Sequence, residues 1–274
     1  MAQKPIPKQL PSRTPIRLKA DTLDREVVRF DSPHLTQGVF LNSVPKSGSH
    51  LLKNVMRMFV PLEDHYGKDF IQWGNLAEHL AAFDPRHPRL SWGHLMFSDS
   101  SAAHAANVRK IHLVRDPHSW ILARARFYVS DQFGDNSSMI KQSGMSAEHL
   151  INLMIFGIHR QALPMRDMFN LTAVAWRGPQ SHWVKYEDVV QAVKNVDTPA
   201  GEAFFTKLMD MAGLPPLPAD WRERVKIGSD RKQSGTAREN LRDVKIQIPD
   251  ELTQEQKELA EYAAPGLRKL LGYE

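Results

Sequence analysis

The most informative stretch of the chain reads Val39-Phe40-Leu41-Asn42-Ser43-Val44-Pro45-Lys46-Ser47-Gly48-Ser49-His50-Leu51-Leu52. An apolar run followed by turn residues predicts a buried strand that enters a tight loop, here from Pro45 to Ser49. A helical period begins at Leu51 and continues to Phe59. The stretch therefore predicts a strand, a short polar loop and a helix in direct succession.

Such a unit is suited to holding a phosphate group. Backbone N–H groups and the positive end of the helix dipole face the anion, and Ser47 and Ser49 can donate their hydroxyls. Lys46 adds a full positive charge. The loop is not the GxxxxGK[ST] loop of ATPases and GTPases, because Lys46 precedes the single glycine, Gly48.

A second unit of the same kind follows later in the chain. Residues 109–117 read as a strand that ends in the polar turn Arg115-Asp116-Pro117, and a helix is predicted from Trp120. Further strands alternate with helices, as at Leu90–Leu95 and Trp183–Tyr186. This alternation predicts an α/β fold with a central parallel sheet that helices cover on both faces.

The two units resemble the nucleotide-binding elements of sulfotransferases that use 3′-phosphoadenosine 5′-phosphosulfate (PAPS). In that family a Pro-Lys-Ser/Thr-Gly-Thr/Ser loop binds the 5′-phosphosulfate, and a strand ending in Arg-Asx-Pro holds the 3′-phosphate. The resemblance implies a single-domain, P-loop-like sulfotransferase fold. It also implies PAPS as cofactor, no metal, and transfer of a sulfuryl group to a hydroxyl or amine of a small-molecule acceptor, leaving adenosine 3′,5′-bisphosphate (PAP).

The resemblance implies two catalytic residues, Lys46 and His94. Lys46 would stabilise charge on the leaving phosphate. His94 lies in Trp92-Gly93-His94-Leu95, where cytosolic-type members carry the His of Lys-x-His-Leu-Pro, although Trp92 replaces the Lys and Met96 replaces the Pro. Histidine is the usual general base near neutral pH. Other branches use a glutamate after the first helix, and Glu63 is that alternative.

The resemblance also assigns cofactor contacts. The residues are Lys46, Ser47, Gly48, Ser49, His50, Leu51, Arg115, Ser119, Tyr186, Arg231 and Lys232. Arg115 is the main candidate for the 3′-phosphate, because a guanidinium can contact two phosphate oxygens at once. We interpret Glu187-Asp188, after Tyr186, as a helix-capping pair.

Three positions depart from the family pattern. Ala123 stands where the family has a Ser on the 3′-phosphate, Gln233 replaces the Gly of an Arg-Lys-Gly loop, and Leu51 replaces a Trp that stacks on adenine. Side chains that could substitute for the missing Ser are Ser119, Arg124 and Arg126.

Composition narrows the classes of function. The chain has 274 residues, 42% hydrophobic and 24% charged, and no Cys, which excludes disulfides, a thiolate nucleophile and Cys-ligated metal. The formal charge is +5, but Lys and Arg are spread along the chain, so we expect an anionic cofactor and no nucleic acid. Aromatic residues in or near 61–89 and 129–170 favour an apolar or aromatic acceptor: Trp73, Phe83, Phe97, Phe127, Tyr128, Phe133 and Phe156.

We expect residues 1–22 to form an extended or disordered arm and residues 23–274 to form one sulfotransferase domain. With neither a signal-peptide core nor about 18 consecutive apolar residues, the sequence predicts a cytoplasmic protein. Local patterns predict an edge strand at 27–30, a mobile loop at 131–143, and long helices from Ser146 to Asp167 and from Pro249 to about Leu271.

Two other classes of protein stay open. A nucleotide-dependent kinase would need a GK[ST] loop and an acidic Mg²⁺ ligand at a strand end. A non-catalytic nucleotide- or nucleic-acid-binding protein would keep the phosphate loops without a working base.

Overall fold

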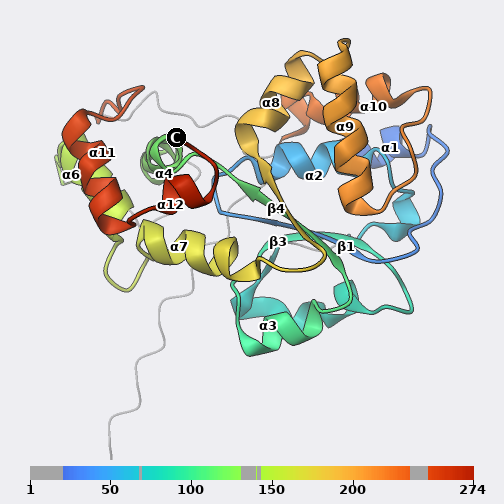
Figure 1. Cartoon of the computed structure of the whole chain (residues 1–274), viewed down its shortest axis with the longest axis horizontal. Coiled ribbons are helices and arrows are strands. Elements are labelled where there is room, and N and C mark those ends of the chain that lie inside the picture. The colour runs from blue at the N-terminus through green and yellow to red at the C-terminus, as the bar shows by residue number, and fades with distance from the viewer. Residues whose placement is uncertain (1–20, 68–69, 131–139, 141–142, 235–245) are drawn as a thin grey trace, which may run out of the picture.

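A parallel sheet of five strands forms the centre of the molecule, as seen in a computed structural model that describes residues 21–67, 70–130, 140, 143–234 and 246–274 (Figure 1). The strand order is β2-β3-β1-β4-β5. The bounds are β1 Val39–Ser43, β2 Ile71–Gln72, β3 Leu90–His94, β4 Arg109–Val114 and β5 Ser181–Lys185. All four pairings are parallel, which confirms the predicted α/β class.

The strand order indicates the carboxyl ends of the central strands as the expected place of a ligand site. β1 is central and pairs with β3 on one side and with β4 on the other. The chain passes from β3 to β4 across β1, so the order reverses there. In open α/β sheets, ligands bind outside the carboxyl ends of the strands at such a reversal.

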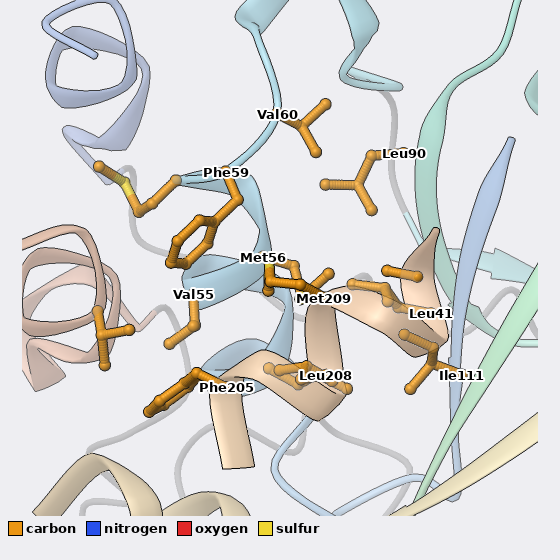
Figure 2. Close-up of a cluster of buried hydrophobic side chains, with 14 of the residues drawn as sticks. Leu41, Val55, Met56, Phe59, Val60, Leu90, Ile111, Phe205, Leu208 and Met209 are labelled. Carbon is orange, nitrogen blue, oxygen red and sulfur yellow. The ribbon is translucent and has the colours of Figure 1, made fainter. Parts of the chain in front are cut away.

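One face of the sheet is covered by a group of helices that pack on β1 and β4 through one large apolar cluster. Figure 2 shows the side chains of Val55 and Met56 from one helix, of Phe59 just after it, and of Phe205, Leu208 and Met209 from another helix, close to Leu41 and Ile111 of the sheet. Leu41 and Ile111 are register partners in adjacent strands. The helices of this face are α1 Leu23–Val27, α2 Ser49–Arg57, α8 Tyr186–Lys194, α9 Pro199–Ala212 and α10 Trp221–Ser229.

Another group of helices covers the opposite side of the sheet at its carboxyl end (Figure 1). Trp120 and Phe169 meet edge to face at its centre, with ring centroids 5.1 Å apart. The helices are α4 Pro117–Val129, α6 Ala147–Phe156, α7 Met165–Thr172, α11 Gln254–Ala263 and α12 Leu267–Leu270. A smaller cluster packs Phe83 on Phe40 of β1. The 3-10 helices η2 Trp73–Phe83 and η4 Val174–Trp176 contribute to it, and α3 Asp99–His104 packs beside η2.

Two predictions of secondary structure are wrong for local reasons. The residues expected as a strand at 27–30 are the last residue of helix α1, Val27, and a turn at 28–30. The helix expected from Ser146 to Asp167 is two helices, because Gly157 has a φ of 91° and Pro164 precedes α7. Ser146 does cap α6, since its side chain accepts the amide of His149.

The C-terminal segment is also divided. A single helix from Pro249 to Leu271 was expected, but α11 ends at Ala263 and α12 begins after Gly266, which has a φ of 71°. Pro265 precedes that glycine and cannot continue a helix. The break lets α12 return to the sheet, where the chain end lies close to α4 (Figure 1).

The predicted arm and loop fall largely outside the described residues, which exclude 1–20, 131–139 and 141–142. Asp21 and Thr22, assigned to the arm, are docked: Arg57 Nη1 donates to Asp21 Oδ2 at 2.9 Å, and Thr22 N donates to Gln233 Oε1 at 2.9 Å. Among the described residues, no helix has the length and apolarity to cross a bilayer.

Candidate functional site

The loop between β1 and α2 has the features of an anion site. Lys46 and Gly48 both have positive φ, 71° and 88°, which for a lysine costs about 1 kcal/mol. Gly48 is the N-cap of the nine-residue α2, and no side chain caps this end of the helix. The backbone hydrogen bonds of α2 begin with Leu51 N, which donates to the Gly48 carbonyl at 2.9 Å, so the amides of Ser49 and His50 are available to an anion.

Ser47 is the buried member of this loop. Its side chain is fully buried, and its Oγ has no hydrogen-bond partner among the described residues. A buried hydroxyl without a partner costs stability, so such groups usually have a role. A phosphate oxygen would supply the missing partner.

Helix α4 holds the loop and the Lys46 side chain. Trp120 Nε1 donates to the carbonyl of Pro45 at 2.6 Å. The ammonium of Lys46 lies 3.7 Å from the centroid of the Phe127 ring, a cation–π contact. The two phosphate-binding units that the sequence predicted are therefore in direct contact.

Arg115, the first residue after β4, strengthens that contact. Its Nη1 donates to the carbonyl of Lys46 at 3.4 Å, and its Nε donates to Ser119 Oγ at 2.9 Å. Its guanidinium carbon lies 4.6 Å from the centroid of the Tyr186 ring. Within the described residues Nη2 makes no hydrogen bond, so this face of the guanidinium can bind an oxyanion.

Tyr186 joins the loop to Arg115. A Cβ placed on Gly48 would lie 2.5 Å from Cε2 of Tyr186, and the φ of Gly48 is also unfavourable for other residues. Only glycine therefore fits at this position. The ring of Tyr186 packs against the loop and against the guanidinium of Arg115, and its contact with a nucleotide stays a prediction.

Of the three side chains that could replace the Ser missing at Ala123, Ser119 alone contacts Arg115 in the described residues. Arg124 is buried and donates to the carbonyls of Met154 at 3.0 Å and Leu163 at 2.8 Å. Arg126 donates to the carbonyl of Pro249 at 2.7 Å. Both arginines are thus engaged elsewhere.

Arg231 and Lys232 lie in the exposed turn η5, Arg231–Gln233. Asn54 Nδ2, on α2, donates to the carbonyl of Gln233 at 2.9 Å. The turn is therefore held beside the helix that begins at the phosphate loop.

His94 ends β3 beside the end of β1. Its Nδ1 lies 3.0 Å from the carbonyl oxygen of Ser43 and 3.0 Å from Ser43 Oγ. A carbonyl only accepts, so Nδ1 carries the proton and Nε2 keeps a lone pair. Burial lowers the pKa of His94 to about 4, and the charge of Lys46 adds to this effect. The imidazole is therefore neutral at neutral pH.

A buried amide fixes the position of His94. Asn42 in β1 accepts the amide of Leu95 at 2.9 Å through Oδ1 and donates to the Leu95 carbonyl at 3.0 Å through Nδ2. These two bonds tie the chain after His94 to β1. The sequence does contain a sign of this role, because Asn42 is a polar residue within the apolar run of β1, but it was not predicted as a functional residue.

Phe70 and Lys53 were also missed. The Phe70 ring stacks on His94 at 5.0 Å with an interplanar angle of 11°, and meets His50 edge to face at 5.1 Å. The Lys53 ammonium lies 5.0 Å from the Trp92 ring and 5.7 Å from the Phe70 ring. A lysine thus lies against Trp92, which itself replaces a lysine of the family pattern.

Burial lowers the pKa values of the basic groups Lys53 and His50. It lowers the pKa of Lys53 to about 8, with the charge of Arg57 adding to the effect. It lowers the pKa of His50 to about 3, with the charge of Lys53 adding. His50 and Lys53 are three residues apart in α2 and therefore lie on one side of the helix. This spacing could have predicted from the sequence that the two basic side chains lie close together.

The structure places Glu63, the alternative base, away from the phosphate loop and from His94. It is exposed in the turn η1, Leu62–Asp64, after α2 has run back along the sheet. The chain then meets the start of β3, where Tyr66 N donates to the carbonyl of Leu90 at 2.9 Å. His94 is the last residue of β3, so Glu63 lies at the opposite edge of the sheet.

The aromatic residues proposed for an acceptor pocket are divided among several places. Phe127 contacts Lys46, and Phe83 packs in the core against Phe40. Phe133 lies outside the described residues. Large exposed side chains in this set are Trp73, Phe97 and Phe156.

Comparisons with known proteins identify the fold. No family model and no curated protein matches the sequence. A solved structure of mouse sulfotransferase SULT7A1 complexed with PAP is similar with a TM-score of 0.55 and 15% identity, covering 88% of this chain and 86% of that chain. Retinol dehydratase in complex with androsterone and the inactive cofactor PAP gives a TM-score of 0.50 and 14% identity, covering 87% and 84%.

These two structures share their architecture with this chain over most of both lengths. The chain therefore has the sulfotransferase fold, as its sequence motifs predicted.

Proposed function

We propose that this chain binds PAPS and transfers its sulfuryl group to a hydroxyl or amine of a small-molecule acceptor. The observation that carries the proposal is the contact between two anion-binding elements at one edge of the sheet, where Arg115 donates to the backbone of Lys46. Two separate phosphates on one nucleotide match this pair of elements. The PAP-bound structures with the same fold support the choice of nucleotide.

The residues present fit the nucleotide. The uncapped start of α2, the unpartnered Ser47 hydroxyl and Lys46 suit the 5′-phosphosulfate. Arg115 with Ser119 suits the 3′-phosphate, and Arg231 and Lys232 in η5 are further candidates for it. PAPS, when bound, supplies a sulfuryl group on a good leaving phosphate.

Positioning and charge are the protein's main contributions to such a transfer. Lys46 brings its ammonium to the loop and stabilises negative charge that develops on the leaving oxygen. The loop backbone, held by Trp120 and Arg115, orients the group to be transferred.

His94 is the proposed general base. Its Nδ1 is held by Ser43, and its Nε2 is neutral and able to take the proton of an acceptor hydroxyl. Phe70, stacked on the imidazole, and Phe127, beneath Lys46, offer apolar surface beside these groups. These contacts favour an acceptor with an apolar or aromatic body.

The binding half of this proposal predicts a specific thermal shift. PAP should raise the melting temperature in the presence of EDTA by about 5 °C or more at a concentration near a hundred times its Kd. AMP and ATP should do much less, because both lack a 3′-phosphate. Differential scanning fluorimetry with the three nucleotides measures this.

A matched pair of variants locates the effect. Arg115→Ala should reduce the PAP shift to that of AMP, whereas Arg166→Ala, at an exposed arginine of α7, should leave it intact. Equal stabilisation by ATP, or a strict need for Mg²⁺, would favour the kinase reading over this proposal.

A further inference from the structure

Residues 267–273 pack onto the carboxyl ends of β4 and β5, beside the Arg115 turn. Arg268 donates to both oxygens of Asp116, from Nε at 2.9 Å and from Nη2 at 2.8 Å. The Tyr273 hydroxyl donates to Glu187 Oε2 at 2.7 Å. Lys185 Nζ donates to the carbonyl of Gly272 at 2.6 Å and lies 4.6 Å from the Tyr273 ring centroid.

Both acidic partners of this segment act on the residues around Arg115. The other oxygen of Glu187, Oε1, accepts the amide of Asp116 at 3.2 Å and lies 3.3 Å from Ser119 Oγ. The single Ser119 hydroxyl proton is shared between this oxygen and the Asp116 carbonyl at 3.2 Å. Ser119 Oγ in turn accepts Nε of Arg115 at 2.9 Å. Asp116 also caps α4, because its Oδ1 accepts the amide of His118 at 3.0 Å.

We infer that Arg268 and Tyr273 are positioning residues for the 3′-phosphate half of the nucleotide site, acting through Asp116 and Glu187. The inference deepens the proposed function and rests on it. A carboxylate that is hydrogen-bonded on both oxygens has one orientation, and here Glu187 Oε1 and the carbonyl of Asp116 together hold the Ser119 hydroxyl. Arg115, held at Nε by Ser119 and against Tyr186, then presents its remaining N–H groups in one direction.

The Tyr273 hydroxyl remains a donor across the working pH range. Burial and the neighbouring Glu187 carboxylate raise the pKa of Tyr273 well above its usual value. The Arg268 guanidinium, by hydrogen bonding, opposes the effect of burial and holds the pKa of Asp116 below its usual range. The network therefore keeps its charges and donors across this pH range. The prediction that Glu187 caps α8 is wrong, because no side chain caps that helix start and the Glu187 carboxylate instead accepts the amide of Asp116 and the hydroxyl of Tyr273.

The test compares two nucleotides that differ only in the 3′-phosphate. Tyr273→Phe keeps the ring on Lys185 and removes the hydroxyl. We expect it to raise the Kd for PAP about fivefold or more and to leave the Kd for AMP unchanged. Tyr262→Phe is the matched control, because Tyr262 is 79% exposed on α11, and both Kd values should stay as in the parent.

Isothermal titration in EDTA separates the outcomes. A role in folding alone would lower the melting temperature and weaken PAP and AMP equally, or change neither, and either result overturns the inference. A parent protein that binds PAP and AMP equally overturns the proposed function as well. Should Tyr273→Phe fail to fold, Arg268→Gln is the second variant, because it removes the paired hydrogen bonds to Asp116. We expect it, too, to raise the Kd for PAP and to leave the Kd for AMP unchanged.

Discussion

Replacing Lys46 with methionine should lower the sulfuryl-transfer rate about a hundredfold, which corresponds to roughly 3 kcal/mol of transition-state stabilisation. Methionine keeps an unbranched apolar chain against Phe127 and removes the ammonium with its charge and its N–H donors. The loss should therefore appear in kcat, with the Kd for PAP changed much less. Single-turnover kinetics with saturating PAPS measures the effect.

Two further variants control for the loop backbone and for net charge. Lys46→Ala should lose as much rate as Lys46→Met, because both lack the ammonium. Lys194→Ala, at an exposed lysine ending α8, removes the same charge far from the loop and should retain parent activity. A Lys46→Met enzyme that turns over at the parent rate would exclude Lys46 from catalysis.

Replacing His94 with asparagine should lower the transfer rate by about two to four orders of magnitude. An Asn amide can still donate to the Ser43 carbonyl, so the variant should fold and bind PAP, but it lacks the lone pair of Nε2. Acceptors whose oxygen is already ionised should partly escape the loss, because no proton then needs to be removed. Rate, PAP affinity and melting temperature are measured on the same preparation.

The pH dependence and a second histidine make this prediction sharper. The pKa of His94 is about 4, so the rate should fall only as the pH drops toward that value and the base becomes protonated. His50→Asn changes the other imidazole that contacts Phe70 and should cost much less rate. If instead His50→Asn is inactive and His94→Asn is active, His50 is the base.

The sequence predicted those parts of the fold that depend on local pattern. The β1–α2 and β4–α4 units, the parallel sheet and the place of His94 at a strand end follow from apolar runs and from the residues that interrupt them. The errors in the predicted helices also have local causes. The apolar periodicity continues past Gly157 and Gly266, but both glycines have positive φ, and the helices are interrupted there.

Contacts between distant segments could not be read from the chain. Arg268 meets Asp116 across 152 residues, and Phe70 reaches His94 only because β2 pairs with the end of β3. Glu63 was an alternative base because other branches of the family have a glutamate after the first helix. In the structure, α2 carries the chain away from the phosphate loop before Glu63 is reached. Roles set by tertiary contact, such as that of Glu187, were accordingly missed.

Transfer of labelled sulfur from PAPS is the most direct test of the account. Purified protein is incubated in EDTA with sulfur-labelled PAPS and a panel of phenols, alcohols and amines, alongside Lys46→Met and His94→Asn. We predict that label appears on at least one acceptor with equimolar PAP, that no metal is needed, and that both variants lose the transfer. Tight PAP binding without transfer to any acceptor, or transfer that both variants retain, would contradict it.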